Sequence, residues 1–256
     1  MKIVVCIKPV LDPRGMTVNR KAEKVFINQE DYVIDPASKA ALEVAAALRV
    51  QNPAAHVIAM SVGTDRADDA LREALARGAD RAILIGLDNI DAWAVANSLS
   101  AAINRLGDID LVLCGEQSLD TGAGELGPRL AENLDWPQIT RAAKVEAHSN
   151  AAHDAGFKAI VQHDGFITQT ISAPAVISIM PEAFTGTFAN GWRLMDAYKQ
   201  IVVDLWRAEE LGLSEDDLRT LTAKKEEAFP SERQPGTPVR NAKELVMMLK
   251  RERIIA

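Results

Sequence analysis

Short runs of apolar, β-branched residues alternate with Ala- and Leu-rich stretches over the first half of the chain. Ile3–Ile7 is the first such run, and its near absence of polar residues is typical of a strand buried on both faces. Apolar residues at helical spacing follow at Pro36–Val50. The alternation then predicts, in order, strand Ala55–Val62, helix Ala67–Arg77, strand Arg81–Ile85, helix Ala92–Arg105, strand Ile109–Cys114 and helix Glu125–Asn133. Strands separated by such helices pair in parallel, so we expect an α/β fold with a Rossmann-like parallel sheet sandwiched by helices.

Two stretches depart from this alternation. Met16–Asn19 and Val25–Asn28 flank a charged turn and predict a small hairpin outside the main sheet. After Thr140 the pattern indicates a β-rich second half, in which the turn around Asp164-Gly165 is a strong hairpin signal. The strands expected there are Ala143–Ala147, Phe157–His163, Phe166–Ile171 and Ala175–Met180.

From Pro181 onward the chain loses strong periodicity. Thr222–Pro238 is charged and carries three prolines, which predicts an extended or mobile segment. Asn241–Arg253 then has the pattern of an amphipathic helix, with an apolar stripe formed by Leu245, Met248 and Leu249. A helix beyond such a linker has no obvious place in a core that is already complete, so we expect it to dock on a partner chain. The predicted organisation is therefore an α/β domain over 1–190 and an extended C-terminal docking arm over 191–256.

Composition narrows the class of protein. Apolar residues make up 48% and charged residues 25%, as in ordinary folded proteins, and the formal net charge of −7 argues against a nucleic-acid partner. The two cysteines, Cys6 and Cys114, lie far apart in apolar runs, which favours buried reduced thiols over a redox pair or a metal site. The apolar start is shorter than a signal peptide, and no run approaches the roughly 20 apolar residues of a membrane span. We therefore expect a cytoplasmic protein.

In an open parallel sheet, ligands bind beyond the carboxyl ends of the strands. Four segments are expected to meet there: Cys6–Lys8, Asp35–Ser38, Ser61–Thr64 and Gly115–Gly127. The last is rich in glycine and runs into a helix, whose N-terminal amides and partial positive charge suit a phosphate or pyrophosphate. Taken alone, the same loop is equally compatible with a tight strand-to-helix turn that binds nothing. It lacks the ending of a P-loop, and no GxGxxG follows the first strand.

Several ordered segments resemble one family. Gly115–Asp120, followed by Gly127 and by Leu134–Gln138, is similar to the β subunit of electron transfer flavoproteins, the family that includes the Fix-type carriers. The resemblance extends over essentially the whole chain. It also includes Val4–Lys8, Gly78–Ala82, Leu194–Lys199 in the place of the family's loop before the C-terminal arm, and Glu244–Val246 with Leu249-Lys250 in its terminal helix.

The resemblance implies an electron-carrying subunit that is not an enzyme in itself. Such a β subunit pairs with an α subunit that holds one FAD, and it holds a second adenine nucleotide itself, which is AMP in common carriers and FAD in electron-bifurcating ones. The complex carries electrons from a dehydrogenase or NADH to a downstream acceptor; an acyl-CoA dehydrogenase-like protein and a quinone- or ferredoxin-linked protein are the redox partners expected. No catalytic residue and no metal site are expected.

Topology and resemblance together give the predicted cofactor-binding residues. They are Cys6, Ile7, Lys8, Asp35, Pro36, Ala37, Ser38, Val62, Gly63, Asp120, Thr121, Gly122, Ala123, Gly124, Glu125, Leu126, Gly127, Pro128, Arg129, Leu130 and Ala131. The family often has acidic residues where Thr121 and Gly122 stand, and Gly127-Pro128 resembles the flavin-binding version. Because small residues leave room for a larger ligand, we favour FAD over AMP in this chain and consider electron bifurcation.

Two other readings compete with this one. Ser61–Asp65 is faintly similar to the anion loop of PP-loop enzymes that use ATP, although it follows the second predicted strand and lacks a second glycine. A nucleotide-binding module of the stress-protein type, without redox work, is the third reading. The apolar stripe of the C-terminal helix and the family resemblance weigh against it.

Overall fold

The computed structural model describes residues 1–88, 90–149, 155–183, 185–223, 228–231 and 235–255. Packing divides the chain into two units. The first comprises Met1–Thr17 and Val25–Ala223, and the second comprises Val18–Lys24 and Lys224–Ala256. Residues 191–223 thus belong to the first unit, while the docking arm expected over 191–256 stays a prediction.

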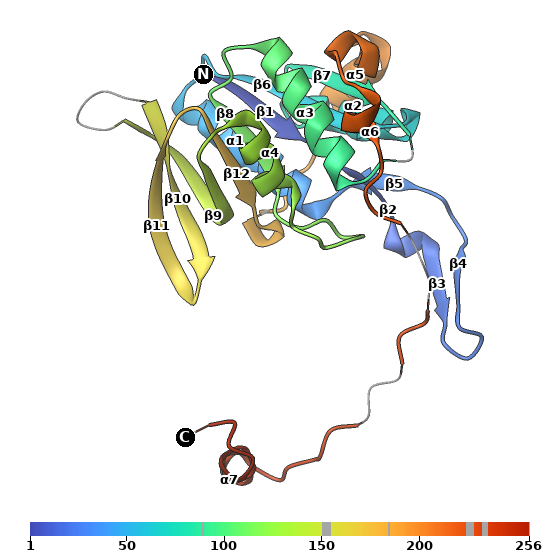
Figure 1. Cartoon of the computed structure of the whole chain (residues 1–256), viewed down its shortest axis with the longest axis vertical. Coiled ribbons are helices and arrows are strands. Elements are labelled where there is room, and N and C mark those ends of the chain that lie inside the picture. The colour runs from blue at the N-terminus through green and yellow to red at the C-terminus, as the bar shows by residue number, and fades with distance from the viewer. Residues whose placement is uncertain (89, 150–154, 184, 224–227, 232–234, 256) are drawn as a thin grey trace. The chain divides into compact units, whose positions relative to one another are not determined.

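A nine-stranded sheet forms the centre of the first unit, in the order β11-β10-β9-β12-β8-β1-β6-β7-β13 (Figure 1). From β9 to β13 in this order, neighbouring strands run parallel, and β10 and β11 add an antiparallel hairpin at one edge. The strands are β1 Lys2–Cys6, β6 His56–Gly63, β7 Arg81–Gly86, β8 Leu111–Gly115, β9 Gln138–Ser149, β10 Ala155–His163, β11 Gly165–Ser172, β12 Ala175–Ile179 and β13 Asp204–Arg207. The predicted Rossmann-like α/β fold is confirmed.

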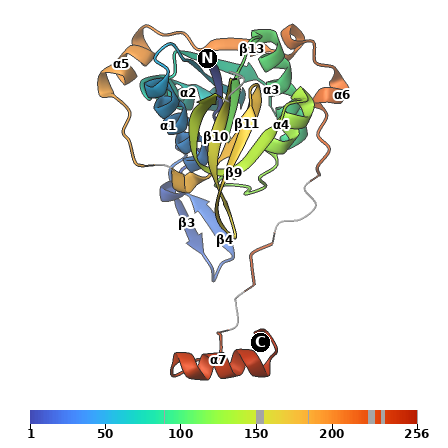
Figure 2. The same cartoon turned by 90° about the vertical axis from the view of Figure 1, so that its left-hand side faces the viewer.

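Helices cover both faces of this sheet (Figure 2). On one face α1 (Pro36–Gln51) and α2 (Asp68–Ala76) pack on one apolar cluster, and on the other α3 (Ala92–Leu106) and α4 (Leu126–Leu134) pack on a second. The first strand divides its side chains between the two clusters: Ile3 and Val5 belong to one, Val4 and Cys6 to the other. This is why its sequence has no polar alternation.

The segment between β1 and α1 makes two small sheets. One pairs β2 (Pro9–Leu11) with β5 (Tyr32–Ile34), which the sequence did not indicate. The other pairs β3 (Met16–Asn19) with β4 (Lys24–Ile27), where a hairpin is predicted. The hairpin expected around Asp164-Gly165 is confirmed as β10–β11.

Between Pro181 and Leu218 the lost periodicity gave no prediction of helices or strands, and Leu194–Lys199 was compared only with a family loop. The structure has α5 (Gly191–Lys199), β13 and α6 (Glu215–Leu218) there, and β13 extends the main sheet beside β7. These elements are short and pack on α2, α3 and β7, so tertiary contacts rather than local periodicity stabilise them. Part of the Pro-containing segment predicted over Thr222–Pro238 lies outside the described residues.

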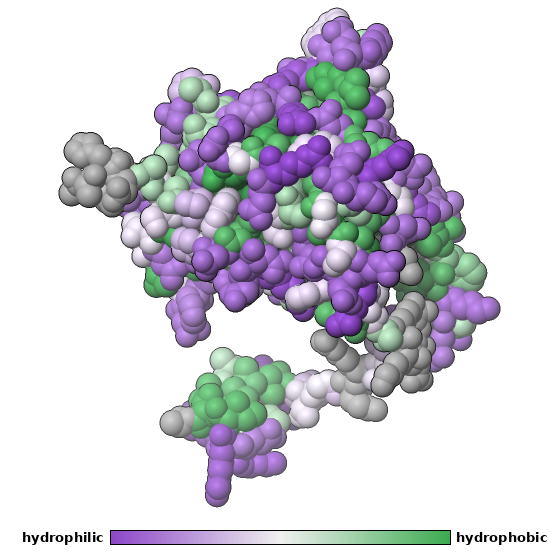
Figure 3. Space-filling view, turned by 45° about the horizontal axis from the view of Figure 1, so that its top comes forward, coloured by the Kyte–Doolittle hydropathy of each residue, from purple (hydrophilic) through white to green (hydrophobic). Residues whose placement is uncertain are grey.

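In the second unit, α7 spans Ala242–Arg251 and has no buried residue. Leu245, Val246 and Met247 are exposed, and Figure 3 shows an apolar face on this helix beside a charged one. Among the described residues, no helix combines the length and the apolarity that crossing a membrane requires.

Candidate functional site

A cavity of about 690 Å³ lies at the carboxyl ends of β1, β6, β7 and β8. Parallel strands place their following loops at this edge, which is why segments far apart in sequence meet there. Most of the predicted site residues line the cavity: Cys6, Ile7, Lys8, Asp35, Ser38, Val62, Gly63, Thr121, Ala123, Gly124, Glu125, Leu126 and Arg129.

The other predicted residues do not line the cavity. They are Pro36, Ala37, Asp120, Gly122, Gly127, Pro128, Leu130 and Ala131. Among them, Asp120 and Gly122 are exposed. Leu130 and Ala131 point into the apolar cluster beneath α3 and α4. Gly127 lets α4 approach the sheet, since a Cβ there would lie 3.3 Å from Cys114 Sγ. Leu130, Ala131 and Gly127 therefore act through the packing of α4 on the sheet.

Sequence reasoning missed a wall of the cavity. Leu87, Asp88, Ile90, Asp91, Trp93, Val95 and Leu99 line it from the end of β7 and from α3, and Leu221 and Thr222 line it from a distant part of the chain. The carboxyl end of the third parallel strand was a signal for the first group. For the second group the link is Asp91, whose Oδ2 accepts hydrogen bonds from the amides of Leu221 (2.8 Å) and Thr222 (3.1 Å).

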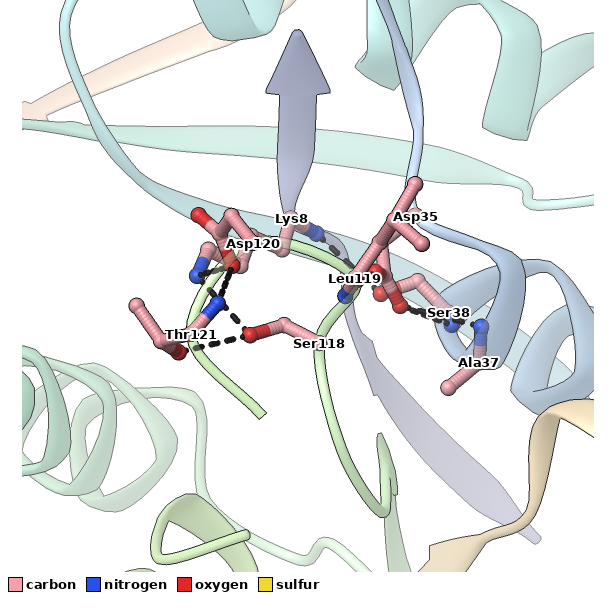
Figure 4. A network of polar contacts seen from close by, with 8 residues as sticks. All are labelled: Lys8, Asp35, Ala37, Ser38, Ser118, Leu119, Asp120 and Thr121. Carbon is pink, nitrogen blue, oxygen red and sulfur yellow. Dashed lines mark hydrogen bonds and ion pairs between the residues drawn. The ribbon is translucent and has the colours of Figure 1, made fainter. Parts of the chain in front are cut away.

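Asp35 closes the N-terminus of α1 (Figure 4). Its Oδ2 accepts the amides of Ala37 at 2.9 Å and Ser38 at 3.3 Å, and its Oδ1 accepts the amide of Leu119 at 2.7 Å. The side chain is buried. A single carboxylate therefore caps the helix and fixes the glycine-rich loop to it.

Lys8 fixes the same loop to the end of β1. Its Nζ lies 2.6 Å from Asp120 Oδ1 and 3.1 Å from Ser118 Oγ, and Ser118 is bonded in turn to Thr121 (Figure 4). Burial raises the pKa of Asp120, but hydrogen bonds from Lys8 and Ser118 outweigh it and hold that pKa below its usual range. The carboxylate is thus charged and paired at neutral pH.

The N-terminus of α4 is different. In the structure as described, the side chain of Glu125, which precedes α4, accepts no amide of that helix. Gly122 and Gly124 have φ of +61° and +67°, a left-handed conformation that favours glycine, and they turn the chain into the helix. The Gly122 amide is already bonded to Ser118 O at 2.9 Å, so the candidate amides for binding a ligand begin at Ala123. Uncapped amides at a helix N-terminus attract an anion.

Every cation on the lining already has an acidic partner. Lys8 is paired with Asp120, Arg66 with Glu30 at 3.2 Å, and Arg129 with Glu125 at 2.7 Å. The acids on the lining are engaged as well: Glu116, for example, accepts the Arg141 amide and the Ser178 hydroxyl. An anionic ligand would therefore rely on backbone amides first, and on Arg129 only in competition with Glu125.

The thiol of Cys6, which lines the cavity, and that of Cys114, which does not, are poor nucleophiles. Burial raises the pKa of Cys6 to about 12, and burial together with the neighbouring Cys6 and Glu116 raises the pKa of Cys114 well above normal. Both side chains belong to the apolar cluster under α3 and α4. Within the described ranges, no group of three or more His, Cys, Asp or Glu side chains is placed to hold a metal ion.

Comparisons with known proteins agree on one family. The model of the electron transfer flavoprotein domain matches residues 23–209. Caffeyl-CoA reductase-Etf complex subunit CarD of Acetobacterium woodii is 30% identical over 220 residues, covering 84% of this chain and 81% of CarD. The electron transfer flavoprotein subunit beta of Thermoanaerobacterium thermosaccharolyticum is 31% identical over 224 residues, covering 85% and 83%. Protein FixA of Azorhizobium caulinodans is 29% identical over 225 residues, covering 84% and 78%.

Proposed function

This chain belongs to the electron transfer flavoprotein family, among its beta subunits and FixA proteins, and from that premise we propose that it is the nucleotide-binding subunit of a heterodimeric electron carrier. The heterodimer carries electrons from a dehydrogenase or NADH to a downstream acceptor. The redox chemistry belongs to the flavin, and this chain contributes position and electrostatics.

The observation that carries the proposal is the uncapped N-terminus of α4 at the cavity. Helix amides that lack a capping side chain, reached through a loop with two left-handed glycines, suit the phosphates of an adenine nucleotide. We assign the phosphate contacts to the amides of Ala123–Leu126 and not to that of Gly122, which is bonded to Ser118 O. Asp35 and Lys8 support the loop from behind rather than neutralise a phosphate.

We favour FAD over AMP as the nucleotide of this chain. Gly122 and Gly124 keep the loop thin, and the cavity of about 690 Å³ lies within the range of about 300–1,000 Å³ typical of small-molecule sites, which leaves room for a dinucleotide. With a second flavin, a hydride from NADH would bring two electrons, to be divided one each between two acceptors. Electron bifurcation is therefore part of the proposal. CarD, a relative, is by name a subunit of a caffeyl-CoA reductase-Etf complex.

The partner is an alpha subunit, and α7 is the proposed docking element. Its exposed apolar side chains, which include Leu245, Val246 and Met247, need a partner surface to be covered. Deleting Asn241–Ala256 should weaken binding to the alpha subunit while thermal unfolding of the remaining chain stays unchanged, because α7 has no buried residue. Unchanged heterodimer affinity after the deletion would exclude this role.

The nucleotides released when the purified heterodimer is denatured test the function directly. Mass spectrometry should find two FAD per heterodimer. One FAD with one AMP would refute bifurcation and leave a single-flavin carrier. One FAD and no second nucleotide would refute nucleotide binding by this chain.

A further inference from the structure

Two buried donors in the cavity wall lack a partner. In the part of the chain that the structure describes, the buried side-chain atoms without a hydrogen bond are Ser61 Oγ, Trp93 Nε1 and Arg49 Nε. Ser61 and Trp93 both line the cavity, whereas Arg49 does not. Buried polar groups are almost always satisfied, so two such atoms in one wall indicate that something absent from the chain pairs with them.

The two donors come from different elements of a largely apolar wall. Ser61 is 1% exposed and lies near the end of β6, and Trp93 lies in the first turn of α3. Leu87, Val95 and Leu99 line the cavity beside them from the end of β7 and from α3. The cations of the lining are already paired with acids. An apolar wall with isolated donors suits a flat heteroaromatic ring better than a phosphate.

The chemistry of the donors defines what they bind. An indole N–H donates and never accepts, and a serine hydroxyl donates or accepts. We propose that Trp93 and Ser61 recognise the ring of the nucleotide, with Trp93 Nε1 donating to a ring nitrogen or a ring carbonyl and Ser61 Oγ bonding the same edge. This rests on the proposed nucleotide binding, and it places the ring against β6 and α3. Adenine and isoalloxazine both offer such acceptors.

Binding constants of AMP and FAD for the heterodimer stripped of its nucleotides test this pairing. Trp93→Phe and Ser61→Ala should each weaken binding by about tenfold, the upper range for one neutral hydrogen bond. Trp192→Phe, on exposed α5, and Ser98→Ala, whose hydroxyl is bonded to Ala94 O, are the matched controls and should leave affinity unchanged. The donors are unpaired without ligand, so Trp93→Phe and Ser61→Ala should not lower the unfolding temperature of the nucleotide-free protein.

Ligand analogues distinguish the two rings. If adenine is recognised, Trp93→Phe weakens AMP and FAD alike, and it has no effect on the deaza-AMP that lacks the bonded nitrogen. If isoalloxazine is recognised, only FAD is weakened. Wild-type affinity of both variants for AMP and FAD overturns the inference and leaves the proposed function intact. Wild-type protein that binds neither nucleotide overturns the function itself.

Discussion

The helices at the cavity begin in two different ways. The first turns of α1 and α3 are closed by Asp35 and Asp91, and each carboxylate accepts two amides of its own helix. α4 begins after Glu125, whose side chain turns instead to Arg129 one helical turn further on. Of these three helices, α1 and α3 thus have N-termini capped by a carboxylate, whereas α4 has no side-chain cap.

The difference shows how a fold separates support from binding. A capped N-terminus has lost its attraction for an anion, because the carboxylate has taken the amides and offset the partial positive charge of the helix. Asp35 and Asp91 use their second oxygen to fix another part of the wall, Leu119 in one case and Leu221 with Thr222 in the other. The capped helices support the wall, and the uncapped helix is the one for which we propose phosphate binding.

The largest expected effect follows from blocking the uncapped end. Gly124→Val places a branched side chain at φ +67°, with its Cβ 3.4 Å from Glu116 O, in the loop that must approach the ligand. Nucleotide affinity should fall at least about 100-fold, or about 2.7 kcal/mol. Gly212→Val is the matched control, since Gly212 has φ +69° and lies off the cavity lining. Both variants should lose similar stability, but only the first should lose the ligand in a titration. Full occupancy of a folded Gly124→Val protein would place the site elsewhere.

The second largest effect is expected when the cap of α1 is removed. Asp35→Ala removes the cap of α1 and leaves the Leu119 amide unpaired, which should lower the free energy of unfolding by about 2 kcal/mol in urea. Asn190→Ala removes the exposed cap of α5 and should cost about 0.5 kcal/mol. Equal losses in the two variants would contradict the double role of Asp35.

A third test uses pH on the other capped end. Burial raises the pKa of Asp91, but the amides of Ala94, Leu221 and Thr222 outweigh it and the net pKa is lowered. The carboxylate therefore stabilises the fold fully above its unfolded pKa of about 3.9, and this contribution is lost as pH falls through the lower folded pKa. Asp91→Asn does not titrate, so the stability difference between wild type and variant should shrink below about pH 4 in urea unfolding. A pH-independent difference would argue against the ionised cap.

The smallest effect concerns the charge beside α4. Glu125→Gln frees Arg129 from its carboxylate partner, so nucleotide affinity should rise by about threefold at low salt. Glu73→Gln removes the carboxylate from a similar ion pair, between Glu73 of α2 and Arg77. Neither residue lines the cavity, so this variant should leave nucleotide affinity unchanged. A decrease in affinity in Glu125→Gln would mean that Glu125 itself contacts the ligand.

Local pattern was sufficient to predict most of the fold. Buried parallel strands such as Ile3–Ile7 have no polar alternation, and α1 and α3 carry apolar residues at helical spacing, so these three elements were found within a few residues of their ends. The four residues of β13 carry no such signal. The guanidinium groups of Arg81 and Arg105, which come from distant parts of the chain, lie 5.6 Å and 4.6 Å from the centre of its Trp206 ring. Contacts of this kind cannot be obtained from a local window.

The site could be predicted as far as strand ends reveal it. The rule that ligands bind at carboxyl ends led to Lys8, Val62 and the glycine-rich loop, and the same rule applied to β7 would have led to Trp93. Leu221 and Thr222 were beyond reach, because they reach the cavity through side-chain and amide bonds to Asp91. The sequence could not indicate that both carboxylate oxygens of Asp35 already accept backbone amides, since these contacts depend on three-dimensional geometry.

Two adjacent residues fix the glycine-rich loop, one through a hydrogen bond and the other through an ion pair. Leu119 donates its amide to a buried carboxylate, whereas Asp120 is paired with Lys8 through side chains that are 45% and 42% exposed. Dissolved ions screen exposed charges over a Debye length of about 8 Å at physiological ionic strength, and the length shortens as salt increases. Higher salt therefore weakens the ion pair of Asp120 and leaves the hydrogen bond of Leu119 in place. The ionic strength of the solution thus changes how firmly the loop is fixed at Asp120 but not at Leu119.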